Sequence, residues 1–427
     1  MRAPPPRLLY VGGFEFPTAQ ARGIQSLHTA HALARAGWGV RVLAQRPGWG
    51  QTRRSTVEAL AGYGLAPHRR LQIVPLPLLR LDRLARLEIH ARLAVANWSY
   101  GLLCLADLLR CRPRPDLVLA RDPRLAWMFL RTRSLHRRPV IYEVHEIFST
   151  RPRDNRSLDP ADIWGVADRT RRLERAVFAE ADLLAPLTRC SADLLRQEHG
   201  VEARRIAAVP DGTMSPEGGL PRRGPGGREV VYAGQLYSWK GVDVLLRAVA
   251  KLPDVTLSVL GGLSTRDGAD PDLARCRALA ERLGIGGRVT FHGFVPHARV
   301  RGRLEGAAAG VVPLPDRLMS RYFTSPLKVF DYMAAGVPIV ASDLPALREV
   351  LTDEENALLV TPDEPDGLAR AIERLLGDPA LADRLRRRAF ADVAAYTWDR
   401  RAERIIEAVR RVVGGSLDSP TSRASEY

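Results

Sequence analysis

The chain has 427 residues, a length that suits two domains of about 200 residues each better than a single core. Hydrophobic residues make up 46% of the sequence, enough to form packed cores, and this content excludes a wholly disordered chain. The net charge of +16 is concentrated in one half, because residues 1–210 hold 34 Arg and no Lys against 19 acidic residues, a net charge of +15.

Short apolar runs alternate with helical patterns through this basic half, which predicts a doubly wound parallel sheet. The first expected strand, residues 8–11, is too short for the apolar core of a secretory signal. It leads into Gly12 and Gly13, and a glycine-rich turn there would let a ligand approach the backbone. A first helix is expected at residues 24–36, and the other strands at residues 40–44, 71–74, 117–120, 140–144, 183–186 and 206–209.

Turn residues at 210–212 end the first predicted domain, which spans residues 1–212, and a linker rich in Gly, Pro and Arg follows at 213–228. A second Rossmann-like domain is predicted at 229–413, with helices after its sheet, and the tail at 414–427 is predicted to be disordered. The carboxyl ends of the two parallel sheets are expected to face a central cleft. Strands are expected at residues 230–233, 256–260, 289–291, 310–312, 339–341 and 358–360, and helices near 241–250, 271–283, 326–335 and 365–376.

The four cysteines show no CxxC spacing and no histidine at zinc-site spacing, so we expect reduced thiols, a cytoplasmic location and no metal site. The Asp-Pro-Asp sequence at residues 270–272 is interpreted as the start of a helix rather than as a pair of metal-binding carboxylates. The longest apolar run, residues 93–109, is interrupted by Asn97 and Asp107 and is too short to span a bilayer.

Residues 79–92 form a basic amphipathic pattern within the basic half. A helix of this kind can lie on an anionic membrane surface, and the pattern also fits an ordinary surface helix packed on its own sheet. The excess of arginine attracts polyanions in general, including nucleic acid or a phosphorylated acceptor. No helix-turn-helix, zinc-finger or RNP pattern supports a specific nucleic-acid partner.

The most specific motif of the chain lies in the second half and reads SPLKVFDYMAAGVPIVAS. Thr324 or Ser325 is expected to cap a helix that starts at Pro326. The free N–H groups and the positive dipole end of such a helix suit a phosphate, and Lys328 in the first turn can reach the same anion. Asp331, one turn further, can accept hydrogen bonds from a ribose diol. A capped amphipathic helix without a ligand is the simpler alternative.

This motif resembles the signature of the family 4 glycosyltransferases, which pairs two Glu residues separated by seven others. Asp331 stands at the second acidic position, and Phe323 stands at the first, where the family's acid contacts hydroxyls of the transferred sugar. The stretch AGQLYSWKG is similar to the family pattern Gly-Arg-Leu, three residues, Lys-Gly. Lys240 matches this pattern, and Gln235 replaces the Arg that helps to neutralise the donor diphosphate. The resemblance implies the GT-B fold, transfer with retention of configuration, and no metal.

The resemblance also implies roles in the first domain. His145, at the end of an expected strand, would lie near the transferred sugar, and the turn at Gly12 and Gly13 would lie near the donor phosphates. The implied catalytic residues are His145, Lys240 and Lys328. The implied donor-binding residues are Gly13, Gln235, Thr324, Ser325, Pro326, Leu327, Asp331 and Glu349, and the implied acceptor-side residues are Gly12, Arg121 and Glu146.

The function implied by the resemblance is transfer of a sugar from a UDP- or GDP-sugar to a hydroxyl of a saccharide or a lipid-linked envelope acceptor, without a cofactor. Two alternatives share the expected fold. One is a nucleotide-sugar 2-epimerase, and the other is a non-catalytic partner subunit that binds a nucleotide sugar, which the departures at Phe323 and Gln235 leave open. If the basic domain binds lipid, the protein is expected at the inner face of the membrane as a peripheral protein.

Overall fold

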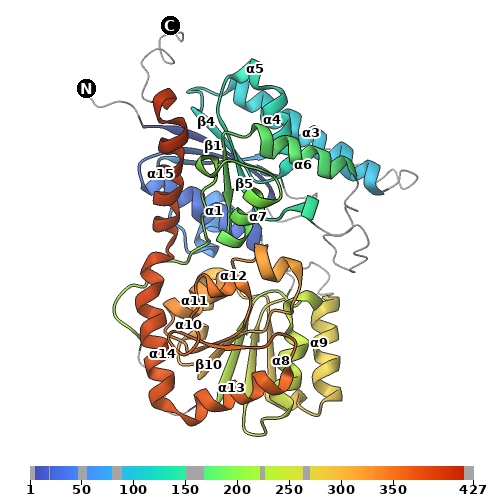
Figure 1. Ribbon diagram of the computed structural model, residues 1–427, viewed down its shortest axis with the longest axis vertical. Helices are drawn as coiled ribbons and strands as arrows, with labels where there is room; N and C mark the ends of the chain where they lie inside the picture. Colours follow the sequence, from blue (N-terminus) through green and yellow to red (C-terminus); the bar gives the residue numbers. More distant parts are fainter. Residues whose placement is uncertain are drawn as a thin grey trace. The chain divides into compact units, whose positions relative to one another are not determined.

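The chain forms two compact units. The first unit contains Met1–Ala61, Leu65–Val209 and Arg401–Tyr427, and the second contains Gly62–Gly64 and Pro210–Arg400. The chain therefore returns to the first unit at its C-terminal end, whereas the sequence analysis placed residues up to 413 with the second domain. The computed structural model describes residues 5–18, 20–46, 55–78, 89–150, 168–221, 227–262 and 270–417 (Figure 1).

The first unit is built around a six-stranded parallel sheet in the order β3-β2-β1-β4-β5-β6. The order reverses between β1 and β4, and ligands of such sheets bind beyond the carboxyl ends of the strands at this point. The strands are β1 (Arg7–Glu15), β2 (Gly39–Gln45), β3 (Leu71–Leu76), β4 (Leu117–Ala120), β5 (Val140–Val144) and β6 (Leu183–Pro186). The helices are α1 (Ala21–Arg35), α2 (Thr56–Gly62), α3 (Ile89–Arg110), α4 (Pro123–Arg131), α5 (Arg133–His136), α6 (Asp168–Glu180) and α7 (Arg189–Gln197).

The second unit repeats this plan with a parallel sheet in the order β12-β11-β10-β7-β8-β9, so its order reverses between β7 and β10. Helices cover both faces of the sheet (Figure 1). The strands are β7 (Glu229–Ala233), β8 (Thr256–Leu260), β9 (Val289–Gly293), β10 (Ala309–Val312), β11 (Ile339–Ser342) and β12 (Leu358–Val360). The helices are α8 (Val242–Ala250), α9 (Pro271–Arg282), α10 (His297–Leu304), α11 (Leu327–Ala334), α12 (Pro345–Arg348), α13 (Pro365–Gly377) and α14 (Pro379–Asp392). The last helix, α15 (Trp398–Leu417), runs from the second unit into the first.

Successive side chains of a strand point to opposite faces of the sheet, and they form the two cores of the second unit. Val230 and Tyr232 pack into one core with α8, α9 and α13, while Val231 and Ala233 pack into the other with α11. Both faces of the central strands are therefore apolar, which explains why β7, β10 and β11 are nearly continuous hydrophobic runs in the sequence. The prediction of two Rossmann-like parallel sheets, with helices after the second, is confirmed.

Three expectations on single elements have different outcomes. The strand expected at residues 206–209 is wrong, because this run forms an isolated bridge to β6, between Ile206 and Leu184, and no regular strand. It still lies along β6, since the N–H groups of Ala207 and Val209 donate to carbonyls of that strand. Asp270 caps α9 as predicted, since its carboxylate accepts the N–H of Leu273 at 3.0 Å. Of the basic segment at 79–92, residues 79–88 lie outside the described residues, and α3 begins at Ile89.

Among the helices that the structure describes, none is both long enough and apolar enough to cross a membrane.

Candidate active site

Two loops of the second unit meet at the point where its strand order reverses. The loop after β7 carries Gly234, Gln235 and Lys240, and α11 follows β10 in the chain. Two glycines shape the loop. Gly234 has a φ of +137°, and Gly241 has a φ of +73° and leaves no room for a Cβ, which would lie 1.7 Å from the carbonyl oxygen of Pro313. The sequence motifs at 232–243 and 325–342 are therefore brought to one end of one sheet.

The ammonium group of Lys328 is buried at this end of the sheet. Its Nζ lies 3.6 Å from the centre of the Tyr232 ring, and within the described residues it makes no hydrogen bond. Burial, and then the charge of Lys240, holds the pKa of Lys328 well below the usual value for a lysine. A Cβ at Gly234 would lie 2.9 Å from this Nζ, so the glycine keeps the space next to the lysine open.

Two further buried polar atoms near this lysine lack partners in the part of the chain that the structure describes. They are Oε1 of Gln235 and Nε1 of Trp239, and both belong to the loop after β7. A buried donor or acceptor without a partner costs roughly 1–3 kcal/mol, so a ligand that hydrogen-bonds to these atoms would gain binding free energy. Lys240 Nζ lies 3.9 Å from the centre of the Trp239 ring, which stacks on Tyr237. The loop and α11 together therefore present two lysines, one hydrogen-bond acceptor and one donor.

Asp331 is already engaged on both carboxylate oxygens. Thr213 donates its hydroxyl to Oδ1 at 2.7 Å, and Nε2 of His297 lies 3.6 Å from Oδ2. Burial disfavours the charged form of His297, but the hydrogen bond and the charge of Asp331 outweigh it and raise the pKa of His297. A ribose diol at Asp331 would therefore share a carboxylate that Thr213 and His297 hold in place. His297 lies outside the sequence motifs and was not among the predicted site residues.

The expected cap of α11 is wrong. The residue before the helix is Pro326, with φ −80° and ψ 115°, and no side chain caps the first turn. The Ser325 hydroxyl instead accepts the N–H of Asp211 at 3.0 Å, and the Thr324 hydroxyl donates to the carbonyl of Met319 at 2.8 Å. Leu327 starts the helix, so the N–H groups of its first turn remain without a capping side chain.

Glu349, expected to bind the donor, lies directly after α12, where its carbonyl accepts the Tyr396 hydroxyl at 3.2 Å. Nothing in the described structure assigns its carboxylate to the site.

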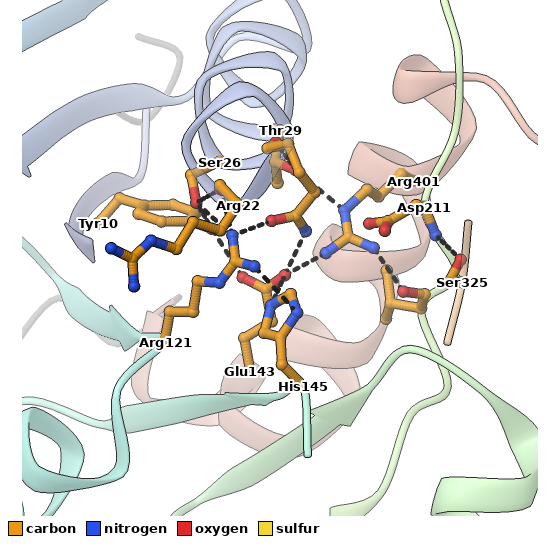
Figure 2. A network of polar contacts seen from close by, with 12 residues as sticks. Tyr10, Arg22, Ser26, Thr29, Arg121, Glu143, His145, Asp211, Ser325 and Arg401 are labelled. Atoms are coloured by element: carbon orange, nitrogen blue, oxygen red, sulfur yellow. Dashed lines mark hydrogen bonds and ion pairs between the residues drawn. The ribbon is translucent and has the colours of Figure 1, made fainter. Parts of the chain in front are cut away.

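In the first unit, a buried carboxylate organises a polar network around the end of β5 (Figure 2). Glu143, 1% exposed, accepts hydrogen bonds from the Tyr10 hydroxyl at 2.7 Å, from Gln25, and from Nε2 of His145 at 3.0 Å. It also forms an ion pair with Arg401 of α15, which is itself 1% exposed. Burial would raise the pKa of Glu143, but the charge of Arg401 and the interaction with His145 lower it well below its usual value.

This network determines the protonation of His145. Nη2 of Arg121 lies 3.1 Å from Nδ1 of His145, and a guanidinium can only donate, so Nδ1 is the acceptor and Nε2 carries the proton. Burial, and then the charge of Arg121, lowers the pKa of His145 to about 4. His145 is therefore neutral near pH 7, and both of its ring nitrogens are engaged. As predicted, it directly follows a strand.

The turn predicted at Gly12 and Gly13 is wrong, because β1 continues through both residues to Glu15. Gly12 is required there, since a Cβ would lie 2.1 Å from the Phe14 ring, and its carbonyl accepts the Tyr100 hydroxyl at 2.8 Å. The predicted acceptor-side residues Arg121 and Glu146 follow β4 and β5, and Glu146 is buried. Of the network, Glu143 could have been found from the sequence, because it lies on β5 only two residues before His145.

No group of three or more His, Cys, Asp or Glu side chains that could hold a metal ion occurs among the described residues.

Comparison with known proteins assigns the family. The model described as "Glycosyl transferase 4-like domain" matches residues 23–212, and "Glycosyl transferases group 1" matches residues 227–378. A D-inositol 3-phosphate glycosyltransferase of Catenulispora acidiphila is 28% identical over 344 residues, which cover 74% of this chain and 77% of that protein. The chain belongs to the family 4 glycosyltransferases. A second relative, the alpha-D-kanosaminyltransferase of Streptomyces kanamyceticus, is 26% identical over 370 residues, 78% of this chain and 91% of that one.

Solved structures of other glycosyltransferases share the fold of this family 4 enzyme. Sucrose-phosphate synthase from Thermosynechococcus elongatus matches with a TM-score of 0.70 at 20% identity, covering 96% of this chain and all of that one. HepE of Anabaena, solved in complex with UDP-glucose, matches with a TM-score of 0.66 at 17% identity, covering 94% and 99% of the two chains. The predictions of a GT-B fold and of a hexosyltransferase are confirmed.

The structure shows how the residue at the first acidic position of the family signature packs. Phe323, at the position of the first acid, is only 3% exposed and packs in the interior. It offers no hydrogen bond to a sugar, so recognition of the transferred sugar must rest on other side chains.

Proposed function

We propose that this enzyme transfers a hexose from a nucleoside diphosphate sugar to a hydroxyl of a saccharide or lipid-linked acceptor, with retention of configuration. The observation that carries the proposal is the set of buried polar atoms without partners at the carboxyl end of β7: Nζ of Lys328, Oε1 of Gln235 and Nε1 of Trp239. The diphosphate of the donor would pair with Lys328. Hydroxyl groups of the donor would form hydrogen bonds with Gln235 Oε1 and Trp239 Nε1. The solved complex of HepE with UDP-glucose favours uridine as the base.

Lys240 and Lys328 would make the largest contribution to lowering the activation barrier. A departing nucleoside diphosphate gains negative charge, and buried cations placed beside it lower the barrier more than cations in water do. Lys240 and Lys328 both lie at the end of the sheet where the diphosphate would bind. Because Gln235 carries no charge, these two lysines would stand in for the arginine of the family pattern. No step of this proposal requires a metal or a protein nucleophile.

The first unit would bind the acceptor. Neutral His145 would be a hydrogen-bonding group for a sugar hydroxyl rather than a general acid, because its pKa is lowered to about 4. The net charge of +15 in residues 1–210 favours an acceptor that carries phosphate or lies at an anionic surface. Two relatives are named for D-inositol 3-phosphate and kanosaminyl transfer, which shows that this family serves different acceptors and sugars.

The test is an analysis of products by nuclear magnetic resonance after incubation with UDP- and GDP-hexoses and an acceptor panel. Retaining transfer gives a new glycoside whose anomeric configuration matches that of the donor. A donor that changes configuration at C2 without any acceptor would identify an epimerase instead. A glycoside of opposite configuration would reject retention but keep the transferase.

A further inference from the structure

The carboxylate of Asp331 is approached by two side chains from separate segments of the second unit. The Thr213 hydroxyl donates to Oδ1 at 2.7 Å, and Nε2 of His297, the first residue of α10, lies 3.6 Å from Oδ2. An ionised carboxylate offers about four acceptor positions, two on each oxygen. One position on each oxygen therefore remains, and this pair matches the two adjacent hydroxyls of a ribose. The Asp331 side chain is 13% exposed, so these positions are within reach of a ligand.

Thr213 is fixed in place by its backbone. Its N–H donates to the carbonyl of Tyr396 at 3.0 Å, and its own carbonyl accepts the N–H of Trp398 at 3.1 Å. The preceding Gly212 packs so closely on this segment that a Cβ would lie 2.7 Å from the carbonyl carbon of Thr397. The hydroxyl of Thr213 is therefore a donor whose position is set before any ligand binds.

His297 has two partners that favour its protonated ring. One is the carboxylate of Asp331, and the other is a hydrogen bond with the backbone of Tyr63, a residue that also belongs to the second unit. Burial alone would lower the pKa of His297, but these two partners raise it above its ordinary value. The positive end of α10, where His297 lies, also disfavours the charged ring. The imidazolium therefore depends on the carboxylate that it holds.

The other charged groups of the two helices are directed elsewhere. Helix α11 carries Lys328 and Asp331, and Lys328 lies over the Tyr232 ring, so Asp331 is the charge of α11 that faces His297. The charged residues of α10 and of the position after it are Arg299, Arg301, Arg303 and Glu305. Arg301 donates to the carbonyl of Ala334 at 3.1 Å, and the other three are exposed.

We propose that His297, as the imidazolium, is a positioning residue that holds the Asp331 carboxylate for the ribose diol of the donor, with Thr213 as the second donor. Loss of the proton would release Oδ2 and let the carboxylate turn away from the diol. The enzyme would then bind ribonucleotides less tightly, whereas ligands without the diol would be unaffected. This role rests on the proposed donor site, and it adds the residues that set the preference of that site for ribose and its dependence on pH.

Binding of UDP and of 2′,3′-dideoxyuridine diphosphate to the full-length enzyme tests this role, with the two guanine counterparts measured alongside. Each pair shares a base and a diphosphate, so the contribution of Lys328 and the ionisation of the phosphate cancel in the ratio of the dissociation constants. We expect the parent to prefer the ribonucleotide at least about tenfold at about pH 6, where a charged group supports the hydrogen bonds to the diol. Because the pKa of His297 is raised, this preference should persist above the ordinary value of about 6.5 and shrink by about pH 9.

Two variants and a control separate the contributions of the two side chains. His297→Gln should show a reduced preference that no longer changes with pH, because glutamine keeps a hydrogen-bond donor but does not titrate. Thr213→Val should also reduce the preference but keep its dependence on pH. The matched control is His292→Gln on β9, which removes an exposed histidine of the same unit and should behave like the parent. Binding of the dideoxy ligand shows that a variant is folded.

A ribose preference that is equal at the two pH values in the parent would overturn the proposal without any variant. So would a preference that His297→Gln leaves unchanged in size and in pH dependence. Equal weakening of both ligands in His297→Gln would mean that the histidine only supports the fold, which also rejects the positioning role. If no nucleoside diphosphate binds the parent, the proposed donor site itself fails, and this outcome is distinct from the other three.

Discussion

The ion pair between Arg401 and Glu143 should contribute strongly to the stability of the first unit. Both residues are 1% exposed, and Arg401 also donates to the Val209 carbonyl and, at 2.9 Å, to the Thr29 hydroxyl. Arg401→Met leaves a buried carboxylate with only uncharged donors. Removing one partner of a buried pair typically costs about 3–5 kcal/mol, and we expect a loss in this range.

Urea unfolding at neutral pH measures this loss, and a double variant provides the control. Glu143→Gln combined with Arg401→Met removes both charges, so it should be less destabilised than the sum of the two single variants. The pH dependence gives a second measurement. Because the pKa of Glu143 is lowered in the folded state, its stabilising contribution is present above the carboxyl's unfolded pKa, about 4.3, and is lost as pH falls toward the folded pKa. Arg401 is the main cause that lowers this pKa, so the loss of stability on acidification should be smaller in Arg401→Met than in the parent.

An Arg401→Met variant whose free energy of unfolding falls by less than about 1 kcal/mol, and which keeps the acid sensitivity of the parent, would refute a stabilising role for this pair. Such a result would mean that the pair is solvated in solution.

Three further predictions concern the catalytic residues. Binding of a nucleoside diphosphate should be accompanied by proton uptake, because the pKa of Lys328 is lowered in the free enzyme and a phosphate beside it would restore the charged form. Calorimetry in two buffers of different ionisation enthalpy measures this uptake. Equal binding heats in the two buffers would contradict the prediction. Gly234→Ala should abolish most nucleotide binding. The φ of +137° at this position strains any residue other than glycine by about 1–3 kcal/mol, and the added Cβ would meet the Nζ of Lys328. An unchanged affinity in the same calorimetry would reject the site. The pH profile of kcat should show no ionisation of His145 near pH 6.5, because its pKa is about 4; an acidic limb there that disappears in His145→Gln would contradict the neutral assignment.

The sequence predicted the sheets better than the site. All six strands of the second sheet were located. The interior strands β10 and β11 are the easiest to recognise, because strands buried on both faces are nearly continuous apolar runs. The run at 206–209 has the same composition but lies at a sheet edge, and composition does not reveal how many neighbours a strand has. The turn predicted at Gly12 failed for a local reason, since glycine there makes room for the Phe14 ring within a strand.

The polar network could be predicted only in part. Glu143 lies on β5 and His145 directly follows this strand, so the proximity of the two residues is a local property. Arg401 lies 258 residues from Glu143 in the sequence, and only the return of α15 to the first unit brings them together. The contact of His297 with Asp331 likewise depends on how α10 packs on α11.

At the centre of the account, the buried Lys328 binds the diphosphate group of a nucleoside diphosphate. The most direct measurement is thermal stabilisation of the enzyme by UDP, GDP, ADP, TDP and CMP, with Lys328→Ala compared with Lys251→Ala. Lys251 is the matched control, because it is an exposed lysine of the same unit that pairs with Asp366. We predict a rise in melting temperature with one diphosphate, kept in Lys251→Ala and lost in Lys328→Ala. No rise with any nucleotide, or an equal rise in both variants, would contradict the account.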